Sequence, residues 1–591
     1  TKISDSKVNS FSYAGMDGDG KYQFKIVPYG GTTMGTAVET EITDYQAPLA
    51  QAELTAAGSK SKVELSWNAV EGASSYDVYR KLGSDGEAVL VKTTAEIAFT
   101  DTDVVEEEPY YYYVVAKNDK NTSIPSATMQ VLTSDGHTGA YVYENEATKL
   151  TVAYKSNDTV FDDNALLVLT ADEAGTAQLY VNDVLADTKT VGAGDEMKFE
   201  PELKKGRNDV TVIFTDAEGN ATRKTFNFVA NPDVDIVVDA AYTGEDGAES
   251  DGLPVYKTVQ AAVNAVPEDN AEAKVIYIKN GEYNERVEVK SPYVSLLGQD
   301  SEKTHLFYSV CVANGNADSM WNRNAMYVDT AATGFTAENL TVENSYDYTN
   351  GSDQQADALC IVADQTACIN VRLIGYQDTL LTDTRTKDEN GNHAVTRQYF
   401  NKCYITGNVD FIYGAGTSVF EDCDIVARYT EYKSDGCYTA GRTYASTPYG
   451  YVFNNCRFLA EEGVADGAYR MARPWGADDS TTFMNCYLGR AISLETSYGD
   501  MSGNLAENAR FAEYGSYGPG YTVNNKRPYL TSAQAAKFKT DTVMGDYDYS
   551  ARTATLYGTQ QEKPKTDITV VDKAEVVKNV AVDENAVIKN A

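Results

Sequence analysis

Histidine, tryptophan and basic residues are scarce in this sequence. Histidine and tryptophan occur three times each in 591 residues, and 50 Lys and Arg stand against 87 Asp and Glu, for a net charge of −37. Nucleic acids and anionic membranes bind to basic surfaces, so we expect neither a nucleic-acid partner nor membrane insertion. An anionic polysaccharide requires a groove that is locally less acidic, and the arginines favour the second half of the chain. Only Arg80, Arg207 and Arg223 precede residue 280.

Cysteine is absent from the first half of the chain. All eight cysteines lie between Cys311 and Cys486, which excludes an array of disulfide-stapled mini-domains. They form no CxxC pair and no Cys/His cluster with zinc spacing, so we expect no metal site. The sequence contains no run of about 18 apolar residues, so it predicts no membrane-spanning helix. Because the chain begins at Thr1 without Met or a signal peptide, we interpret it as a processed or trimmed piece of a larger protein.

Tyrosine, in contrast, is abundant, with 43 residues beside 44 glycines. Tyrosine together with many threonines and valines is typical of strands, so we predict an all-β protein. At about 150 residues per domain, a chain of this length corresponds to roughly three to five domains.

The first 231 residues show the alternating pattern of β-sandwiches. Residues 47–134 resemble a fibronectin type III module, through Trp67 and the strands SYDVYR and YYYVVAKN, and 1–46 could be a partial or divergent copy. Residues 135–231 predict an immunoglobulin-like sandwich, because DAEGNAT separates two alternating runs. No catalytic spacing occurs in these modules. We expect a spacer or scaffold, with carbohydrate binding through exposed tyrosines as the alternative.

The sequence pattern changes at residues 233–550. After a helical pattern that ends at Pro267, a short polar–apolar unit recurs at irregular spacings of about 20 to 33 residues. Such recurrence predicts a parallel β-solenoid, whose stacked coils bury one continuous core. One interior column should hold Leu340, Val371, Cys403, Cys423, Cys456 and Cys486. We expect packed free thiols there, with disulfides as the alternative, because side chains in a column point the same way. The tail or linker at 551–591 suggests no function.

Two acids stand in apolar, strand-like segments, Asp378 in GYQDTLLTD and Asp410 in NVDFIYG. Taken singly, each fits a turn cap or a solvated loop. On a solenoid, however, residues one coil apart become neighbours at about 5 Å, and these acids are 32 residues apart. We therefore predict that they meet on one exposed face. The cluster is completed by Gln355, Gln377, and Arg473 and Trp475 of the ARPWG turn.

The charges of this cluster predict distinct roles. Two adjacent carboxylates do not both ionise cheaply, so one keeps its proton. Arg473 beside Asp410 would hold Asp410 ionised, which leaves Asp378 protonated. An anionic nucleophile, a proton donor, and two amide donors from Gln355 and Gln377 suit ester hydrolysis through an oxyanion.

The three histidines do not supply the base of a Ser–His–Asp esterase. They are His137 in a predicted sandwich, His305, and His393 in a polar loop, and no GxSxG elbow lies near the solenoid core. Hydrolysis in this chain must therefore use carboxylates, and it needs no metal and no organic cofactor.

Residues 233–550 resemble the pectin methylesterases, carbohydrate esterases built on a right-handed parallel β-helix. The matching segments, in family order, are YKTVQAAVNAVP, IKNGEYNERVEV, FTAENLTVEN, QADALCI, GYQDTL, GNVDFIYG, ARPWG and FAEYGSYGPG. The resemblance implies removal of methyl esters from the galacturonate units of pectin, with release of methanol. The residues it implies are the nucleophile Asp410, the acid/base Asp378, the oxyanion donors Gln355 and Gln377, Arg473 holding Asp410, and Trp475 contacting the sugar.

Three positions depart from the family pattern. Tyr413 replaces the usual Phe, which predicts a similar wall with an added hydroxyl in the groove. Ala472 replaces the usual Gly of the ARPWG turn and predicts a slight shift of that turn. Asp357 stands where an apolar residue is common and, if exposed, would repel galacturonate carboxylates and favour methylated stretches. Tyr308 and Tyr346 are further candidates for the lining of the cleft.

Two alternatives compete with this interpretation. Another pectin-active β-helix enzyme would need either the calcium-binding acids and base of a lyase or the acid pair of a polygalacturonase, about 6.5–9.5 Å apart. A non-catalytic polysaccharide-binding surface protein would not need Asp378, Asp410 and Arg473 intact. We expect a monomer that acts on methylated homogalacturonan. We expect it to be secreted or held at a bacterial cell surface, although the chain carries no signal peptide.

Overall fold

The computed structural model describes residues 20–30, 33–45, 48–134, 149–219, 221–312, 319–349, 354–550 and 556–557. The chain divides into two compact units, residues 1–135 with 523–525 and the remainder. Most of the tail predicted at 551–591, and the start of the module predicted at 1–46, lie outside the described residues. Within those described residues, no helix is long and apolar enough to cross a membrane.

The first unit holds a hairpin and a two-sheet sandwich. In the hairpin, β1 (Gly20–Ile26) pairs antiparallel with β4 (Val38–Tyr45), and β2 (Tyr29–Gly30) pairs with β3 (Thr33–Met34). The sheets of the sandwich are β5 (Leu54–Ser59), β6 (Lys62–Trp67) and β9 (Ala98–Asp101), and β11 (Met129–Leu132), β10 (Pro109–Lys117), β7 (Ser75–Leu82) and β8 (Val89–Thr94). Trp67, Tyr76 and Tyr112 lie in the core between them.

The second unit begins with another sandwich. One sheet is β12 (Leu150–Lys155), β14 (Leu167–Ala171) and β17 (Glu196–Phe199), and the other is β13 (Thr159–Val160), β19 (Ala221–Ala230), β18 (Gly206–Asp216), β15 (Gly175–Val181) and β16 (Val184–Val191). Strands β18 and β19 pair antiparallel along their length, which confirms the hairpin predicted from DAEGNAT. Phe199, Phe214 and Phe228 are buried in the core.

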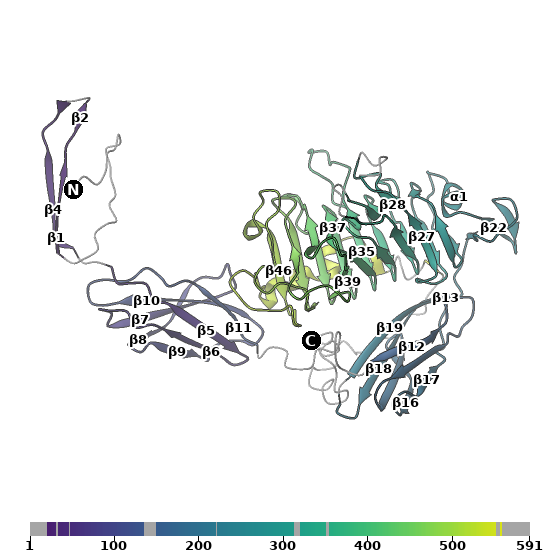
Figure 1. Cartoon of the computed structure of the whole chain (residues 1–591), viewed down its shortest axis with the longest axis horizontal. Coiled ribbons are helices and arrows are strands. Elements are labelled where there is room, and N and C mark those ends of the chain that lie inside the picture. Colours follow the sequence, from purple (N-terminus) through teal and green to yellow (C-terminus); the bar gives the residue numbers. More distant parts are fainter. Residues whose placement is uncertain are drawn as a thin grey trace. The chain divides into compact units, whose positions relative to one another are not determined.

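The remainder of this unit is a parallel β-helix, which confirms the predicted solenoid (Figure 1). Successive coils add strands to three sheets, and every pairing is parallel except that of β21 with β22. The first sheet is β21 (Ala248–Ser250), β22 (Leu253–Tyr256), β20 (Ile236–Val238), β23 (Lys274–Ile278), β26 (Val294–Gly298), β29 (Thr336–Glu338), β32 (Thr366–Ile369), β35 (Arg397–Asn401), β38 (Thr417–Glu421), β41 (Tyr451–Asn454), β44 (Ser480–Met484) and β46 (Arg510–Tyr514).

The other two sheets complete the coils. The second sheet is β24 (Gly281–Asn284), β27 (Thr304–Tyr308), β30 (Thr341–Asn344), β33 (Arg372–Ile374), β36 (Tyr404–Gly407), β39 (Asp424–Ala427), β42 (Arg457–Ala460) and β45 (Tyr487–Leu488). The third sheet is β25 (Val287–Val289), β28 (Asn324–Val328), β31 (Asp357–Ile361), β34 (Leu380–Thr382), β37 (Val409–Gly414), β40 (Gly436–Gly441) and β43 (Tyr469–Ala472).

A left-handed residue precedes the second-sheet strand in six successive coils. These residues, with φ between 52° and 59°, are Asn339, Asn370, Lys402, Asp422, Asn455 and Asn485. Asn and Asp tolerate this conformation better than other side chains do, because their short polar groups bond to the local backbone. The turn between the first two sheets therefore accounts for the polar residue that begins each recurring unit of the sequence.

The interior column predicted from the repeat is present. Strand pairing places Leu340, Val371, Cys403, Cys423, Cys456 and Cys486 in register. All eight cysteines of the chain are free and buried, so they pack as small apolar side chains. Beside this column, Phe400, Phe420, Phe453 and Phe483 stack with ring centroids 4.6–5.4 Å apart. Stacked identical residues give the coils one continuous apolar core.

Short helices cover the ends and one flank of the β-helix. Helix α1 (Val259–Asn264), which confirms the helical pattern before Pro267, is capped by Thr258, whose hydroxyl accepts from the Ala261 N–H. It packs on the interior core. Near the other end, α2 (Ser532–Ala535) and α3 (Thr540–Met544) pack on apolar residues of the first sheet. Two 3-10 turns complete the set, η1 (Ala506–Asn508) and η2 (Ala536–Phe538).

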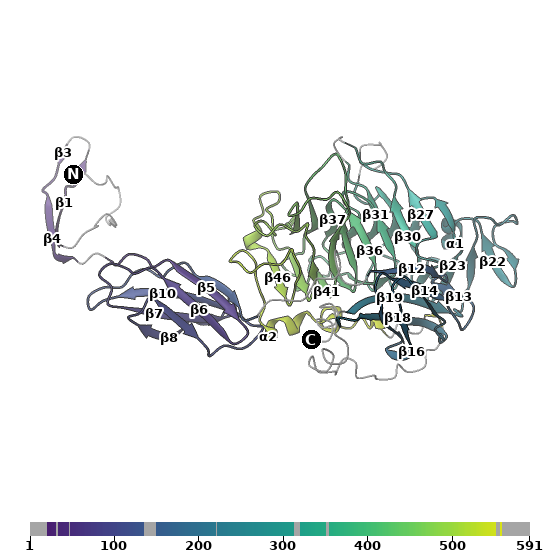
Figure 2. The same cartoon turned by 60° about the horizontal axis from the view of Figure 1, so that its bottom comes forward.

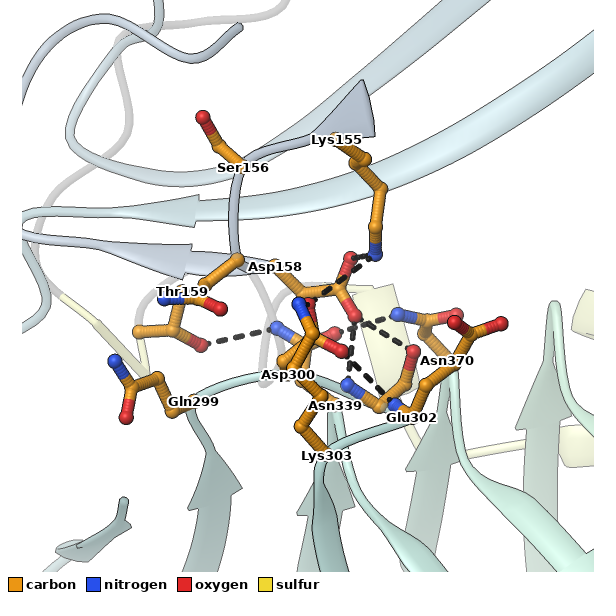
Figure 3. Close-up of polar contacts among 12 residues, drawn as sticks. Lys155, Ser156, Asp158, Thr159, Gln299, Asp300, Glu302, Lys303, Asn339 and Asn370 are labelled. Atoms are coloured by element: carbon orange, nitrogen blue, oxygen red, sulfur yellow. Dashed lines mark hydrogen bonds and ion pairs between the residues drawn. The ribbon is translucent and has the colours of Figure 1, made fainter. Parts of the chain in front are cut away.

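The second sandwich packs against the flank of the β-helix through buried polar groups (Figures 2 and 3). Asp158, 1% exposed, accepts hydrogen bonds from the Ser301 N–H at 2.8 Å and the Ser301 hydroxyl at 2.6 Å. Lys155 pairs with Asp158 and lies 3.6 Å from Asp300. Thr159 donates its N–H and hydroxyl to the carbonyls of residues 299 and 298. The sandwich is therefore held to the first coils by specific bonds.

A buried ion pair extends this junction. Arg207 donates to Glu338 from Nε at 2.8 Å and from its terminal nitrogen at 2.5 Å, and Glu338 is fully buried. The Tyr557 hydroxyl and the Asn227 amide each donate to the same carboxylate at 2.8 Å. Three side chains from distant parts of the chain thus satisfy one carboxylate with four hydrogen bonds, which offsets the usual cost of burying it.

The cysteine column leads to a thiol prediction. In the native protein no thiol should react with Ellman's reagent, because all eight are buried and only an exposed thiolate is reactive. After unfolding in guanidinium without reductant, all eight should react. Reaction of six or fewer thiols would instead support the disulfides that the sequence analysis gave as the alternative.

The junction leads to a stability prediction. Replacement of Asp158 by Ala removes the nearest negative charge that balances the buried Lys155, and it removes both hydrogen bonds to Ser301. The free energy of unfolding should therefore fall by about 3–5 kcal/mol. Urea unfolding checks this, with Asp162→Ala at a neighbouring exposed aspartate as the control, which should change it by about 0.5 kcal/mol or less. Equal midpoints for the two variants would contradict the role of Asp158.

Candidate active site

Asp378 and Asp410 lie on adjacent coils of the third sheet. Asp378 comes two residues before β34, and Asp410 is the second residue of β37. The Asp378 N–H donates to the Val409 carbonyl at 3.0 Å, which holds the two backbones side by side. Their exposed fractions are 7% and 5%. The structure therefore brings the two predicted carboxylates together. The expectation that they meet on an exposed face is wrong, because each is largely withdrawn from water.

Both aspartates have a left-handed backbone. Their φ values are 66° for Asp378 and 51° for Asp410, and the strand register shifts between Val409 and Ile412, as at a bulge. A bulge re-aims side chains at a strand end, and bulges are frequent beside active sites. Strained backbone of this kind costs about 1–3 kcal/mol per residue and persists where the surrounding structure enforces it. Here, parallel pairing on both sides of the two coils enforces it.

Arg473 binds Asp410 with two parallel hydrogen bonds. It follows β43 directly, and its Nε and terminal nitrogen lie 2.6 Å from the two oxygens of Asp410. The Arg473 N–H donates to the Thr439 carbonyl at 3.1 Å, so the main chain of the preceding coil positions the guanidinium. Such a two-pronged pair fixes both the charge and the orientation of the carboxylate.

The surroundings affect the two carboxyl groups differently. Burial raises the pKa of Asp378 well above its usual range; the positive charge of Arg323 opposes this shift, and the negative charge of Asp410 adds to it. Burial also raises the pKa of Asp410, but the hydrogen bonds and charge of Arg473 counteract that effect. Asp410 therefore ionises first and Asp378 keeps its proton longer, which is the order needed for one nucleophile and one acid.

The two glutamines lie next to this pair. Gln355 comes just before β31, and the N–H of Ala356 donates to the Gln377 carbonyl at 3.1 Å, which sets the two glutamine-bearing coils side by side. Within the described part of the chain, the buried Gln355 Oε1 has no hydrogen-bond partner. This oxygen can therefore accept a hydrogen bond from a ligand.

Trp475 and Tyr413 lie on the outer face of the third sheet. Their ring centroids are 5.9 Å apart, and Trp475, half-buried, packs with Trp321 on a cluster that contains Tyr413. The expectation of a Tyr413 hydroxyl in the groove is wrong. Tyr413 is only 4% exposed, and its hydroxyl donates inward to Asp357 at 2.7 Å.

The predicted repulsive role of Asp357 is also wrong. Its premise was exposure, but Asp357 is completely buried. Asp357 begins β31, where an apolar residue would be expected, and it is tolerated because Tyr413 donates to it and Arg323 lies 3.5 Å away. A buried carboxylate with such partners cannot repel the carboxylates of a bound polymer.

Tyr308 and Tyr346 lie further along the coils. Tyr308 ends β27, pairs in register with Asn344 and packs against the interior core. Tyr346 is partly exposed beside Cys311. Their contact with sugar stays a prediction.

Arg323 was missed by the sequence analysis. It comes just before β28 and donates to Asp378 at 2.7 Å and to the Tyr413 hydroxyl at 2.8 Å. One signal was available, because Arg323 and Gln355 both stand just before third-sheet strands, one coil apart. Arg442 was also missed; its guanidinium lies 4.3 Å from the Trp475 ring and pairs with Asp383.

Comparison with known proteins agrees with this geometry. The family described as Pectinesterase matches residues 248–545. Pectinesterase A of Dickeya dadantii (strain 3937) is 33% identical over 342 residues, which cover 51% of this chain and 89% of that protein. Probable pectinesterase/pectinesterase inhibitor 58 of Arabidopsis thaliana is 33% identical over 282 residues, or 46% of each chain.

Solved structures include the pectin methylesterase PemA from Erwinia chrysanthemi. It aligns at 28% identity with a TM-score of 0.45, over 53% of this chain and 98% of that one. The family match spans half of the sequence, and the first bacterial relative is covered almost throughout. The chain therefore belongs to the pectinesterase family, the carboxylic ester hydrolases that remove methyl esters from pectin.

Proposed function

We propose that this chain de-esterifies pectin with Asp410 as the nucleophile and Asp378 as the general acid and base. The observation that carries the proposal is the ion pair of Arg473 with Asp410, both of whose bonds measure 2.6 Å, one coil from a carboxyl that keeps its proton. One ionised and one protonated carboxyl in a largely dry site are the pair that this chemistry needs.

Asp410 begins the reaction. A carboxylate oxygen of Asp410 attacks the carbonyl carbon of a methylated galacturonate unit, and the carbonyl electrons move onto its oxygen. Arg473 holds the carboxylate plane fixed, which lowers the entropic cost of attack. The side-chain N–H groups of Gln355 and Gln377 donate to the oxyanion that forms. Each such preorganised donor is worth about 10²–10³ in rate.

Asp378 then acts as the acid. The tetrahedral intermediate collapses, the bond to the methoxy oxygen breaks, and that oxygen takes the Asp378 proton and leaves as methanol. What remains is an acyl-enzyme, in which Asp410 is joined to the galacturonate carbonyl as an anhydride, and Asp378 is now a carboxylate.

Water completes the cycle. Asp378 removes one proton from a water molecule, whose oxygen attacks the acyl carbon of the intermediate. Collapse releases the galacturonic acid and restores the Asp410 carboxylate, and Asp378 holds a proton again. The sum is one ester and one water converted to one acid and one methanol, so protons and electrons balance without a metal or an organic cofactor.

The substrate is methylated homogalacturonan, bound over the outer face of the third sheet. Trp475 offers an aromatic face to a sugar ring. Arg442 and Arg473 offset the charges of Asp383 and Asp410, which keeps this face less acidic than a chain of net charge −37 would suggest. Because pectin is a polymer of plant cell walls, the protein acts outside its cell, as a secreted or surface-held monomer. The sandwiches, fibronectin-like at 47–134 and immunoglobulin-like at 135–231, serve as scaffold.

A product assay tests the proposed activity. Methylated pectin should yield methanol and free carboxylates, with unchanged chain length and no unsaturated ends. Shortened chains would support a polygalacturonase, unsaturated ends would support a lyase, and an inert protein would support a surface-binding role. Asp410→Asn and Asp378→Asn should each lower kcat by about 10⁴-fold or more, because each removes one half of the pair.

The role of Arg473 leads to a pH prediction. Arg473 favours the ionised form of Asp410, so Arg473→Gln should raise the pKa of Asp410 by about 1–3 units. Since the nucleophile must be ionised, the acid limb of the kcat–pH profile should move upward by a similar amount. Arg372→Gln, which removes a guanidinium that lies over Tyr404 of the second sheet, is the control. An acid limb that stays in place in Arg473→Gln would refute this role.

A further inference from the structure

Behind Asp378 lies a buried set of polar side chains that the proposed mechanism does not use. Arg323, Asp357 and Tyr413 are 9%, 0% and 4% exposed. Arg323 donates from one terminal nitrogen both to Asp378 at 2.7 Å and to the Tyr413 hydroxyl at 2.8 Å. The Tyr413 hydroxyl in turn donates to Asp357 at 2.7 Å, and Arg323 Nε lies 3.5 Å from the same oxygen of Asp357.

Strand register builds this set from successive coils. Arg323 comes directly before β28, Asp357 begins β31, and Tyr413 lies in β37. Asn324 pairs with Asp357, and Leu381 of the intervening strand pairs with Tyr413. The set therefore spans the coils on both sides of Asp378 and ends in the same strand that carries Asp410.

One guanidinium here faces two carboxyl groups. A cation beside an acid favours the ionised form, and the closer and less shared the cation is, the larger the effect. If Asp378 had Arg323 to itself, the pair would ionise Asp378 and remove the proton that ester cleavage requires. Asp357 supplies a second carboxylate, and the Tyr413 hydroxyl points its hydrogen at that carboxylate and so stabilises its ionised form.

We propose that Arg323, Asp357 and Tyr413 are positioning residues that hold Asp378 in place and keep it in its protonated, proton-donating form. Arg323 anchors the Asp378 carboxyl by one hydrogen bond. Asp357, supported by Tyr413, takes up the positive charge of Arg323. The inference rests on the proposed function, because it concerns the acid of that same reaction.

The surroundings are consistent with an ionised Asp357 and a protonated Asp378. The charged or titratable groups that face Asp378 and Asp357 are Arg323, Asp410, Arg473, Tyr413 and Cys360, while Lys433 faces Asp410. Burial raises the pKa of Asp357 to about 7 against the opposing charge of Arg323, whereas Asp378 moves well above its usual range. Cys360 stays a neutral thiol, since burial raises its pKa too.

A second trio in the same unit shows what a purely structural arrangement looks like. Arg207 donates to Glu338 from two of its nitrogens, and Glu338 also accepts from Tyr557. This trio lies at the sandwich junction and takes no part in the proposed reaction. Arg323 differs because its hydrogen bond goes to Asp378 while its neutralising charge partner is Asp357.

The test measures the alkaline limb of the kcat–pH profile, where Asp378 loses its proton, on methylated pectin. In Asp357→Asn the whole charge of Arg323 acts on Asp378, so the limb should move down by about 1–3 pH units, while KM changes less than twofold. In Tyr413→Phe, Asp357 loses a stabilising donor, and the limb should move the same way by less. The double variant Asp357→Asn/Arg323→Gln lacks both the cation and its balancing carboxylate, so its alkaline limb should return to the parent's position or above it.

Tyr557→Phe is the matched control, because it removes the tyrosine-to-carboxylate bond of the structural trio, and its limb should stay at the parent's position. Uniformly lower kcat with an unmoved limb in both Asp357→Asn and Tyr413→Phe would overturn the proposal and leave the trio a structural role. If Asp357→Asn does not fold, Tyr413→Phe decides alone. A parent that releases no methanol would instead refute the proposed function, so the two failures are distinct.

Discussion

Parallel stacking of the coils is the constraint on which the rest of this structure depends. Because each strand pairs in register with the strand one coil later, residues about 20 to 35 positions apart become neighbours, and identical positions form columns. The free thiols and the phenylalanine ladder are one result, since each column needs side chains that stack on their own kind. The active face is another. Asp378 and Asp410 meet because the Asp378 N–H donates to the carbonyl of the residue before Asp410.

The same stacking explains how the fold accommodates polar residues at depth. At the turn before the second sheet, the left-handed asparagines at 339 and 370 bond to each other at 2.8 Å. Asn339 also forms hydrogen bonds with Thr159 and Asn227 of the sandwich. That column serves architecture, because it offers amides to a neighbouring domain. On the third sheet, left-handed aspartates on adjacent coils pair with Arg323 and Arg473. The conformation is alike in both places, and the side chain and its partners decide whether the position supports docking or chemistry.

The sequence predicted those parts that depend on register. The solenoid, the cysteine column, the helix before Pro267 and the juxtaposition of Asp378 with Asp410 all follow from spacing alone. Burial was harder to predict. Asp357 looked like a groove residue because acids are mostly exposed, and its buried partners come from residues 34 positions earlier and 56 later. Pairing between distant side chains, such as Arg207 with Glu338 across 131 residues, leaves no local pattern to detect.

Charge balance joins the fold to the proposed chemistry. Three carboxyl groups, Asp357, Asp378 and Asp410, share two guanidinium groups, Arg323 and Arg473. A buried site tolerates little net charge, so the set is most stable with one proton among the three acids. In the proposed mechanism, that proton is the one transferred to methanol. A methyl ester adds no charge on binding. The product acid, once ionised, adds a negative charge next to Asp410. Like charges in a poorly screened site repel strongly. The arrangement that favours attack in the proposed mechanism therefore also favours release of the product.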